Sequence, residues 1–239
     1  MITVFKREFK TYFTSVIGYV FFALFMLFYG VAFYTSIIGG ETSGFASTGM
    51  SNFFGFIYFV LILLVPVLTM RLLSEERKQK TDQLLLTSPI TPTAIVLGKF
   101  FSAFAIYAIA VASTVFFALI VAATGSLNFV EYIGMAVGIL LIGAALIAVG
   151  EFISSITVSQ VVAAFATFGA IILTFVPVLL INIISSPLLQ TVLGLISLHT
   201  RYTDFTSGLF DVSNILFYIS FTAVFLFLTV RVMEKRRWS

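Results

Sequence analysis

The sequence predicts an all-α integral membrane protein with six transmembrane helices, and three observations lead to that fold class. Of its 239 residues, 60% are hydrophobic and only 10% are charged, whereas about a quarter of the residues in an ordinary soluble domain are charged. Six apolar stretches reach the roughly 20 residues that a helix needs to cross a bilayer. The alternation of polar and apolar residues that is typical of membrane barrels is absent from the sequence. Because a helix satisfies its own backbone hydrogen bonds in lipid, we expect each stretch to be helical.

Residues 1–15 predict an amphipathic helix that lies in the surface of the membrane. The basic residues Lys6, Arg7 and Lys10 lie off an apolar stripe with helical spacing, which is the pattern of an interfacial helix. The stripe consists of Ile2, Phe5, Phe9, Tyr12, Phe13 and Val16. The simpler alternative is a basic anchor in front of the first span. The apolar run that follows is longer than the roughly 7–15 residues of a signal-peptide core, so we interpret it as a retained span.

The six predicted spans are expected to leave both termini in the cytoplasm. In chain order they cover residues 16–38, 53–70, 94–123, 132–153, 161–184 and 212–230. In this orientation, twelve of the 13 Lys and Arg residues fall on the cytoplasmic side and only Arg201 falls outside, as the positive-inside rule requires. An even number of spans also puts both termini on one side. The net charge of +3 therefore indicates topology rather than nucleic-acid binding.

Segment 185–211, between the fifth and sixth spans, is predicted to contain an outer helix that does not cross the membrane. Ser186 and Pro187 are typical of an N-cap followed by Pro in the first turn. The apolar run after them is too short to span a bilayer, so we expect a re-entrant or interfacial helix. Nothing in the sequence predicts a separate water-soluble domain, and residues 1–239 are interpreted as a single transmembrane domain.

The polar loop 73–92 is predicted to hold a short cytoplasmic helix between the second and third spans. Thr81 and Asp82 can cap such a helix, and Pro89 limits it. The three leucines of Leu84–Leu86 cannot all face the same way on a helix, so some would be exposed to the cytosol unless another protein covers them. Two alternatives stay open: a docking helix for a soluble partner, or a loop folded back onto its own bundle.

Four segments carry a resemblance to a known family. The loop "EERKQKTDQLLLTSPIT" resembles the cytoplasmic loop of ABC type-2 permeases, in which acidic residues, a basic cluster, a Thr and a Leu-Leu-Leu run before Pro-Ile recur. "GEFISSITVSQVVAA" (Gly150–Ala164) is similar to the segment that joins the fourth and fifth spans of that family. "SLHTRYTDFTSGLFDVSNILFY" (Ser197–Tyr218) is similar to the outer stretch before its sixth span, and "VMEKRRW" to its tail. The resemblance covers essentially the whole chain and is greatest for the permeases of gliding-motility ABC systems. Where many relatives have Gly-Thr-Leu-Glu, this chain has Lys-Thr-Asp-Gln.

The resemblance implies the transmembrane permease subunit of an ATP-driven exporter in the bacterial inner membrane, paired with a second copy of itself or with a related permease. Separate ATP-binding subunits would dock beneath the pair and bind ATP and Mg, so this chain is expected to be non-catalytic and to hold no cofactor. Its sequence has no G-x-x-x-x-G-K-[ST] phosphate loop. The residues expected to contact the ATP-binding subunit are Glu75, Glu76, Thr81, Leu84, Leu85, Leu86 and Pro89.

Two other functions compete with export. A complex of the same build could do mechanical or assembly work, as in gliding machinery, without moving a small substrate. An intramembrane enzyme would need a catalytic pair deep in the spans. The sequence offers no mid-span Asp pair, no Ser/His pairing and no set of metal ligands, and it contains one His and no Cys. The sequence identifies neither the substrate nor the permease partner.

Several single residues in or near the spans have both a packing and a functional interpretation. Gly134, Gly138 and Gly143 form a small-residue stripe that permits close helix approach, either at a seam between subunits or inside one bundle. Glu151, near the inner end of the fourth span, could be a functional acid or could reach water or a neighbouring helix end. His199 is interpreted as a hydrogen-bonding bracket, with a ligand or proton relay as the alternative.

Overall fold

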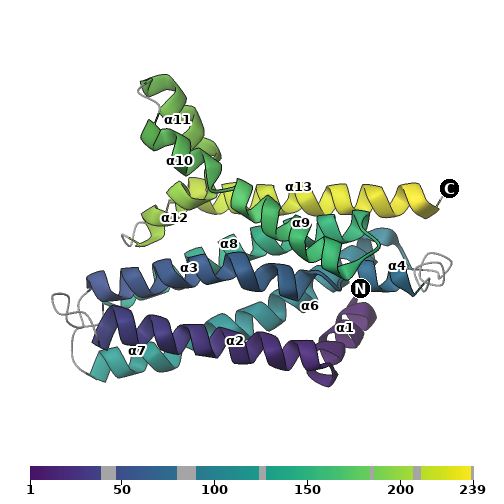
Figure 1. The fold of residues 1–239 in the computed structure, drawn as a ribbon, viewed down its shortest axis with the longest axis horizontal. Helices are drawn as coiled ribbons and strands as arrows, with labels where there is room; N and C mark the ends of the chain where they lie inside the picture. Colours follow the sequence, from purple (N-terminus) through teal and green to yellow (C-terminus); the bar gives the residue numbers. More distant parts are fainter. Residues whose placement is uncertain (39–46, 80–89, 124–127, 184–185, 207–210, 238–239) are drawn as a thin grey trace.

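The structure, a computed structural model, describes residues 1–38, 47–79, 90–123, 128–183, 186–206 and 211–237, and every regular element in this part of the chain is a helix (Figure 1). Six of these helical segments are long and apolar enough to cross a membrane, which confirms the predicted fold class. They lie side by side as an elongated bundle. Figure 1 shows the N-terminal helix, the short helix α4 and the C-terminal end of the last helix at the same end of the bundle.

In chain order, the helices are α1 (Ile2–Thr14), α2 (Val16–Phe33), the short π-helix η1 (Tyr34–Ile38), α3 (Ser47–Thr69), α4 (Ser74–Lys78), α6 (Pro92–Ala112), α7 (Thr114–Ala123), α8 (Phe129–Ile156), α9 (Gln160–Leu173), α10 (Val176–Ile183), α11 (Pro187–Ile196), α12 (Leu198–Thr206) and α13 (Val212–Arg237).

Two of the spans expected to be continuous are divided. The third consists of α6 and α7, which meet at Ser113. The fifth consists of α9 and α10, and Pro177 lies at the start of α10, where a missing N–H costs no helical hydrogen bond. By contrast, Pro66 lies inside α3 without ending it. α6 begins with a side-chain cap. The Thr91 side chain accepts a hydrogen bond from the backbone N–H of Ala94, and Pro92 occupies the first helical position.

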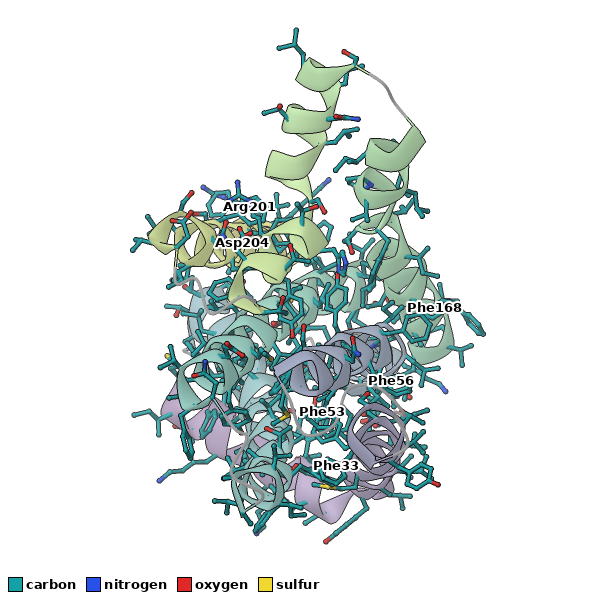
Figure 2. All side chains as sticks on the ribbon, turned by 90° about the vertical axis from the view of Figure 1, so that its left-hand side faces the viewer. Phe33, Phe53, Phe56, Phe168, Arg201 and Asp204 are labelled. Atoms are coloured by element: carbon teal, nitrogen blue, oxygen red, sulfur yellow. The ribbon has the colours of Figure 1, made fainter. Side chains whose placement is uncertain are left out.

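Helix α8 is the centre of the bundle, since it packs against α3, α6, α9, α12 and α13. Helices α2 and α3, of which α3 packs against α8, supply an aromatic core, in which Tyr29 lies 4.0 Å from Phe25 and 5.8 Å from Phe53 between ring centroids. Figure 2 looks along the bundle and shows Phe33 and Phe53 inside it, while Phe168 of α9 points away from it at the edge. Aromatic pairs of this kind add to the stability that burial of their surface provides.

The outer segment contains two helices rather than the single one expected. α11 begins at the predicted cap, with Ser186 in the N-cap position and Pro187 at the first turn. α12 follows and is tied to α13, because the Tyr218 hydroxyl donates to the Leu198 carbonyl at 2.6 Å and Arg201 donates to the Asn214 side chain at 2.8 Å. The hairpin formed by α10 and α11 stands away from the rest of the bundle (Figure 1).

Helix α1 has a bundle-facing side that the predicted apolar stripe identified only in part, since Tyr12 belongs to the stripe and Val4 does not. Val4 and Tyr12 are buried, and the Tyr12 hydroxyl donates to the Leu68 carbonyl at 2.9 Å. On the predicted stripe, Ile2 and Phe13 are exposed. Phe13 continues a row of neighbouring rings with Phe9 and Phe5, which are both half-buried. An apolar row of this kind suits a helix that lies at a membrane surface, which stays a prediction.

Candidate functional site

Most of the predicted docking helix lies outside the described residues. This holds for Thr81, Leu84, Leu85, Leu86 and Pro89, so the structure tests neither the docking alternative nor the folded-back alternative. Glu75 and Glu76 are described, and both lie on α4, directly before that segment. The site that can be built from the structure is therefore the junction at which α4 meets the bundle.

The sequence analysis did not predict α4. Its sequence is Ser-Glu-Glu-Arg-Lys, with both acids in the first turn and both bases in the last. This order complements the helix dipole, which is positive at the N-terminus and negative at the C-terminus. That charge order is the signal in the sequence that could have identified the helix.

The N-terminus of α4 is held by a hydroxyl from another helix. Ser154 of α8 is fully buried, and its Oγ accepts hydrogen bonds from the backbone N–H groups of Leu73 and Ser74, each at 3.1 Å. A helix leaves its first N–H groups without internal partners, and a side-chain oxygen normally satisfies them from the N-cap position. Here α8 supplies that oxygen, which attaches α4 to the centre of the bundle.

The C-terminal part of α4 also contacts the end of α8. The guanidinium of Arg77 donates to the carbonyls of Ile156, at 2.5 Å, and Ser155, at 3.4 Å. Arg236, from the last turn of α13, donates to the same Ser155 carbonyl. Carbonyls at a helix C-terminus lack internal partners and carry partial negative charge, so cations are favourable there. The two arginines thereby join α4, α8 and α13.

A cluster of four charged side chains attaches the other side of α4 to α1 and α6. Lys99 of α6 has a side chain that is only 2% exposed, and its Nζ lies 2.9 Å from Glu76 Oε1 and 3.3 Å from Glu8 Oε1. Arg7 donates to the same two acids, at 2.7 Å to Glu8 and 3.2 Å to Glu76. We call Arg7, Glu8, Glu76 and Lys99 the charge cluster. In the sequence, Lys99 is a single Lys in an apolar run and Glu8 is an acid within α1, but only the fold brings the two together.

The charge cluster determines the ionisation of Glu8. Burial raises the pKa of the Glu8 carboxyl, but the charge of Lys99 and the charge and hydrogen bond of Arg7 together lower that pKa below its ordinary value. Glu8 is therefore a carboxylate at neutral pH. Burial raises the pKa of the Glu76 carboxyl above its ordinary value, although the charge and hydrogen bond of Lys99 act to lower it. Pairing of opposite charges in the cluster offsets part of the large cost of removing charges from water.

Glu151 lies nearby on α8 but is not part of the charge cluster. It is fully buried, and neither of its carboxyl oxygens has a hydrogen-bond partner among the described residues. The packing interpretation, in which this acid reaches water or a helix N-terminus, therefore finds no support in the described part of the chain. Lys99 and Glu8 are the charged groups that act on it electrostatically.

Glu75 forms a separate ion pair on the solvent side of α4. It accepts hydrogen bonds from the guanidinium of Arg71, one turn earlier, through both of its oxygens. The two side chains line a small pocket between α1 and the turn before α4. The remaining lining residues are Glu8, Thr11, Tyr12, Ser15 and Leu72.

The glycine stripe of α8 is packed inside the bundle where its surroundings are described. A Cβ atom on Gly143 would overlap the ring of Tyr107 of α6, and one on Gly138 would lie 2.9 Å from Phe205 of α12. Gly134 is also buried. These contacts favour internal packing, one of the two alternatives for Gly138 and Gly143, over a subunit seam.

His199 lies at the other end of the bundle, half-buried on α12. Its ring centroid is 5.0 Å from that of Tyr58 and 5.9 Å from that of Phe175, and its Nδ1 has no hydrogen-bond partner among the described residues. Burial lowers the pKa of the imidazole. The structure therefore shows aromatic packing for His199 and gives no support to a hydrogen bond at Nδ1.

The junction joins α4 to other helices through charges and hydrogen bonds. Among the described residues there is no group of three or more His, Asp or Glu side chains that could hold a metal ion. What the junction offers is a short helix fixed by charges and hydrogen bonds to α1, α6 and α8, next to the predicted docking segment.

Comparison with known proteins places the chain in a family. No curated protein matches it. The model of a family described as ABC-2 family transporter protein matches residues 2–238, which include every helix of the bundle. Members of this family are membrane transport components, and the six apolar helices agree with a multi-pass membrane protein. The chain belongs to the ABC-2 family of transporter proteins.

Proposed function

We propose that the chain is the membrane-spanning permease subunit of an ATP-driven exporter, and that it docks a separate ATP-binding subunit through the loop 73–92. The match to the ABC-2 family over residues 2–238 is the observation that carries this proposal. In such a complex this chain forms the translocation pathway, and the partner hydrolyses ATP. The proposed contact residues are Glu75, Glu76, Thr81, Leu84, Leu85, Leu86 and Pro89.

The position of α4 supports a coupling role for the segment that follows it. α4 contains Glu75 and Glu76, and it ends at Lys78, shortly before the other proposed docking residues. It is held to α8 through Ser154 and to α6 through the 2.9 Å ion pair of Glu76 with Lys99. Since buried ion pairs and hydrogen bonds of this kind resist separation, a force applied to segment 80–89 would pass to several spans at once.

The basic residues at the α4 end of the bundle indicate how the chain is oriented in the membrane. α1, α4 and the C-terminal end of α13 lie together (Figure 1), and most of the Lys and Arg residues belong to these segments. We propose that this end faces the cytoplasm of a bacterial inner membrane, as the positive-inside rule predicts. A substrate that is hydrophobic or amphipathic fits the apolar spans best.

Co-purification tests the docking proposal. The chain is expressed with the ABC ATPase encoded beside it and purified through a tag on this chain. The wild-type chain is expected to retain the ATPase. Replacement of Leu84, Leu85 and Leu86 by Asp is expected to abolish retention, because charged side chains cannot be buried in an apolar contact.

The matched control carries the same change at the opposite end of the bundle. Leu188→Asp with Leu189→Asp on α11 alters two exposed leucines and should leave ATPase retention intact. Retention that survives the Leu84–Leu86 changes would refute docking through this segment. ATP-dependent transport by the complex in vesicles then separates export from the mechanical function of gliding-type systems.

A further inference from the structure

Glu151 is a carboxyl group that the proposed function does not use. It lies on α8, is fully buried, and has no hydrogen-bond partner at either oxygen among the described residues. An ionised carboxylate in such surroundings would be highly unfavourable, so the group is neutral in this structure. Ionisable residues inside membrane helices are rare and are usually functional. A neutral buried acid without a partner therefore requires an explanation.

Lys99 is the cation that acts most strongly on Glu151. It lies on α6, which packs against α8. Its ammonium group is now shared between Glu76 and Glu8. A Lys side chain carries three donors on a flexible four-carbon stem, so its ammonium group can exchange one acceptor for another. The structure thus holds one buried ammonium group that two acids engage, and a third, unpartnered acid on the helix that packs against α6.

We propose that Glu151 is an alternative partner of Lys99, which Lys99 reaches when Glu76 is withdrawn together with α4. In this exchange the hydrogen bonds of Lys99 pass from Glu76 and Glu8 to Glu151, which gives its proton to solvent. Glu8 keeps a partner, because Arg7 donates to it at 2.7 Å. Every charge therefore remains paired or becomes exposed, and the junction has two stable arrangements.

The exchange deepens the proposed function, because docked ATPase subunits would supply the force that withdraws α4. It would give the junction two discrete states, with α4 bound to α6 in one and released from it in the other. Such bistability is what allows a small local displacement to become a defined change between conformations. The exchange itself, however, can be produced in the chain alone by removing the present partners of Lys99.

Infrared spectroscopy of the purified full chain in lipid at neutral pH tests the proposal. The C=O stretch of a protonated carboxyl group is expected in the wild-type spectrum, and Glu151→Gln is expected to remove it, which assigns the band. In the double variant Glu8→Gln with Glu76→Gln, Lys99 is expected to move to Glu151. The band should then fall by about tenfold or more, which requires that the pKa of Glu151 drops to about one unit or more below the pH of the measurement.

Two further variants make the result specific. Glu75→Gln is the matched control, because Glu75 pairs with Arg71 rather than with Lys99, and it should leave the band unchanged. Adding Lys99→Met to the double variant removes the cation and should restore the band. A band that persists in the double variant overturns the proposal, as does unfolding of that variant while the variant with Lys99→Met stays folded.

The same measurement on the complex with the ATPase tests the coupling to ATP separately. With the ATPase bound and trapped with ATP and vanadate, the band of Glu151 is expected to decrease as it does in the double variant. A band that decreases in the double variant but not in the trapped complex would support the exchange and count against the proposed coupling to ATP. Failure of the proposed function and failure of this inference therefore give different results.

Discussion

A lysine near the end of a membrane span normally extends its ammonium group to water, but Lys99 does not. Lys99 is only 1% exposed, because α1 covers the start of α6. The Glu8 carboxylate of α1 lies 3.3 Å from the ammonium nitrogen and takes the place of water there. The neighbouring Gly98 permits that cover, since a Cβ atom there would lie 3.0 Å from the Val4 side chain. The absence of a side chain at Gly98 therefore lets α1 lie close over the start of α6.

At the same scale, we predict that Gly143→Ala destabilises the fold. The added methyl group would overlap the ring of Tyr107, whose hydroxyl donates to the Ile139 carbonyl at 2.5 Å. Overpacking of this kind costs roughly 1–3 kcal/mol, so the temperature of thermal unfolding in detergent should fall.

The matched control is Gly30→Ala on α2, where a Cβ atom would meet nothing within 4 Å. There the change should leave thermal unfolding unchanged or raise its temperature, because Ala is the better helix former by about 1 kcal/mol. Equal stability of Gly143→Ala and the wild type would show that α6 and α8 can move apart at this point.

At the scale of elements, α4 is a short helix that owes its stability to its neighbours. Isolated helices of fewer than about 12 residues are marginal in water, and α4 has five. Ser154 supports its N-terminus and Arg77 attaches it to the end of α8. α4 therefore attaches the chain to the bundle shortly before the proposed docking residues that follow it.

We predict that Ser154→Ala loosens α4 while the bundle stays folded. The change leaves the N–H groups of Leu73 and Ser74 without their acceptor, and loss of an N-cap hydroxyl typically costs about 1 kcal/mol. Hydrogen–deuterium exchange of a peptide that covers residues 73–78 should therefore become faster.

The neighbouring variant Ser155→Ala is the control for this measurement. The hydroxyl of Ser155 donates only within its own helix, to the Phe152 carbonyl at 2.6 Å, so exchange in α4 should keep its wild-type rate. Identical exchange rates in both variants would contradict the role given to Ser154.

At the scale of the whole molecule, the six spans differ in how much of their surface the bundle covers. About two thirds of the most apolar stretch of α8 is buried in the bundle. In the span formed by α9 and α10, only 11% of the corresponding stretch is buried. The α10–α11 hairpin continues from α9 and stands away from the bundle on its own (Figure 1). A permease that pairs with a second copy would cover this face, and we propose α9 as the pairing surface.

Disulfide cross-linking tests this pairing, and the chain suits it because it contains no cysteine. Phe165→Cys places a thiol on α9, where the native side chain is 73% exposed. We predict that oxidation in membranes yields a covalent dimer of this variant.

Phe116→Cys on α7 is matched in residue type and, at 72%, in exposure. Helix α7 lies on another side of the bundle from α9 (Figure 1). This variant should remain monomeric under the same oxidation. Dimers from both positions, or from neither, would argue against α9 as the pairing surface.

The sequence by itself determined the fold class and the membrane-spanning segments of this protein. Hydrophobicity acts over about 20 consecutive residues and needs no knowledge of the neighbours in space, so six helices could be predicted and the structure confirms them. Caps are equally local, as Thr91 and Ser186 show at the starts of α6 and α11. The division of the fifth span before Pro177 could not be placed, because Pro is also tolerated inside membrane helices, as Pro66 shows.

Only the tertiary structure decided the composition of the junction. Glu8, Glu76 and Lys99 are separated by 68 and 23 positions in the sequence, and no local pattern connects them. Glu151 is left without a partner in the same region. Whether a charge in an apolar helix is solvated, paired or isolated depends on which helices cover it, and that is a property of packing rather than of spacing along the chain.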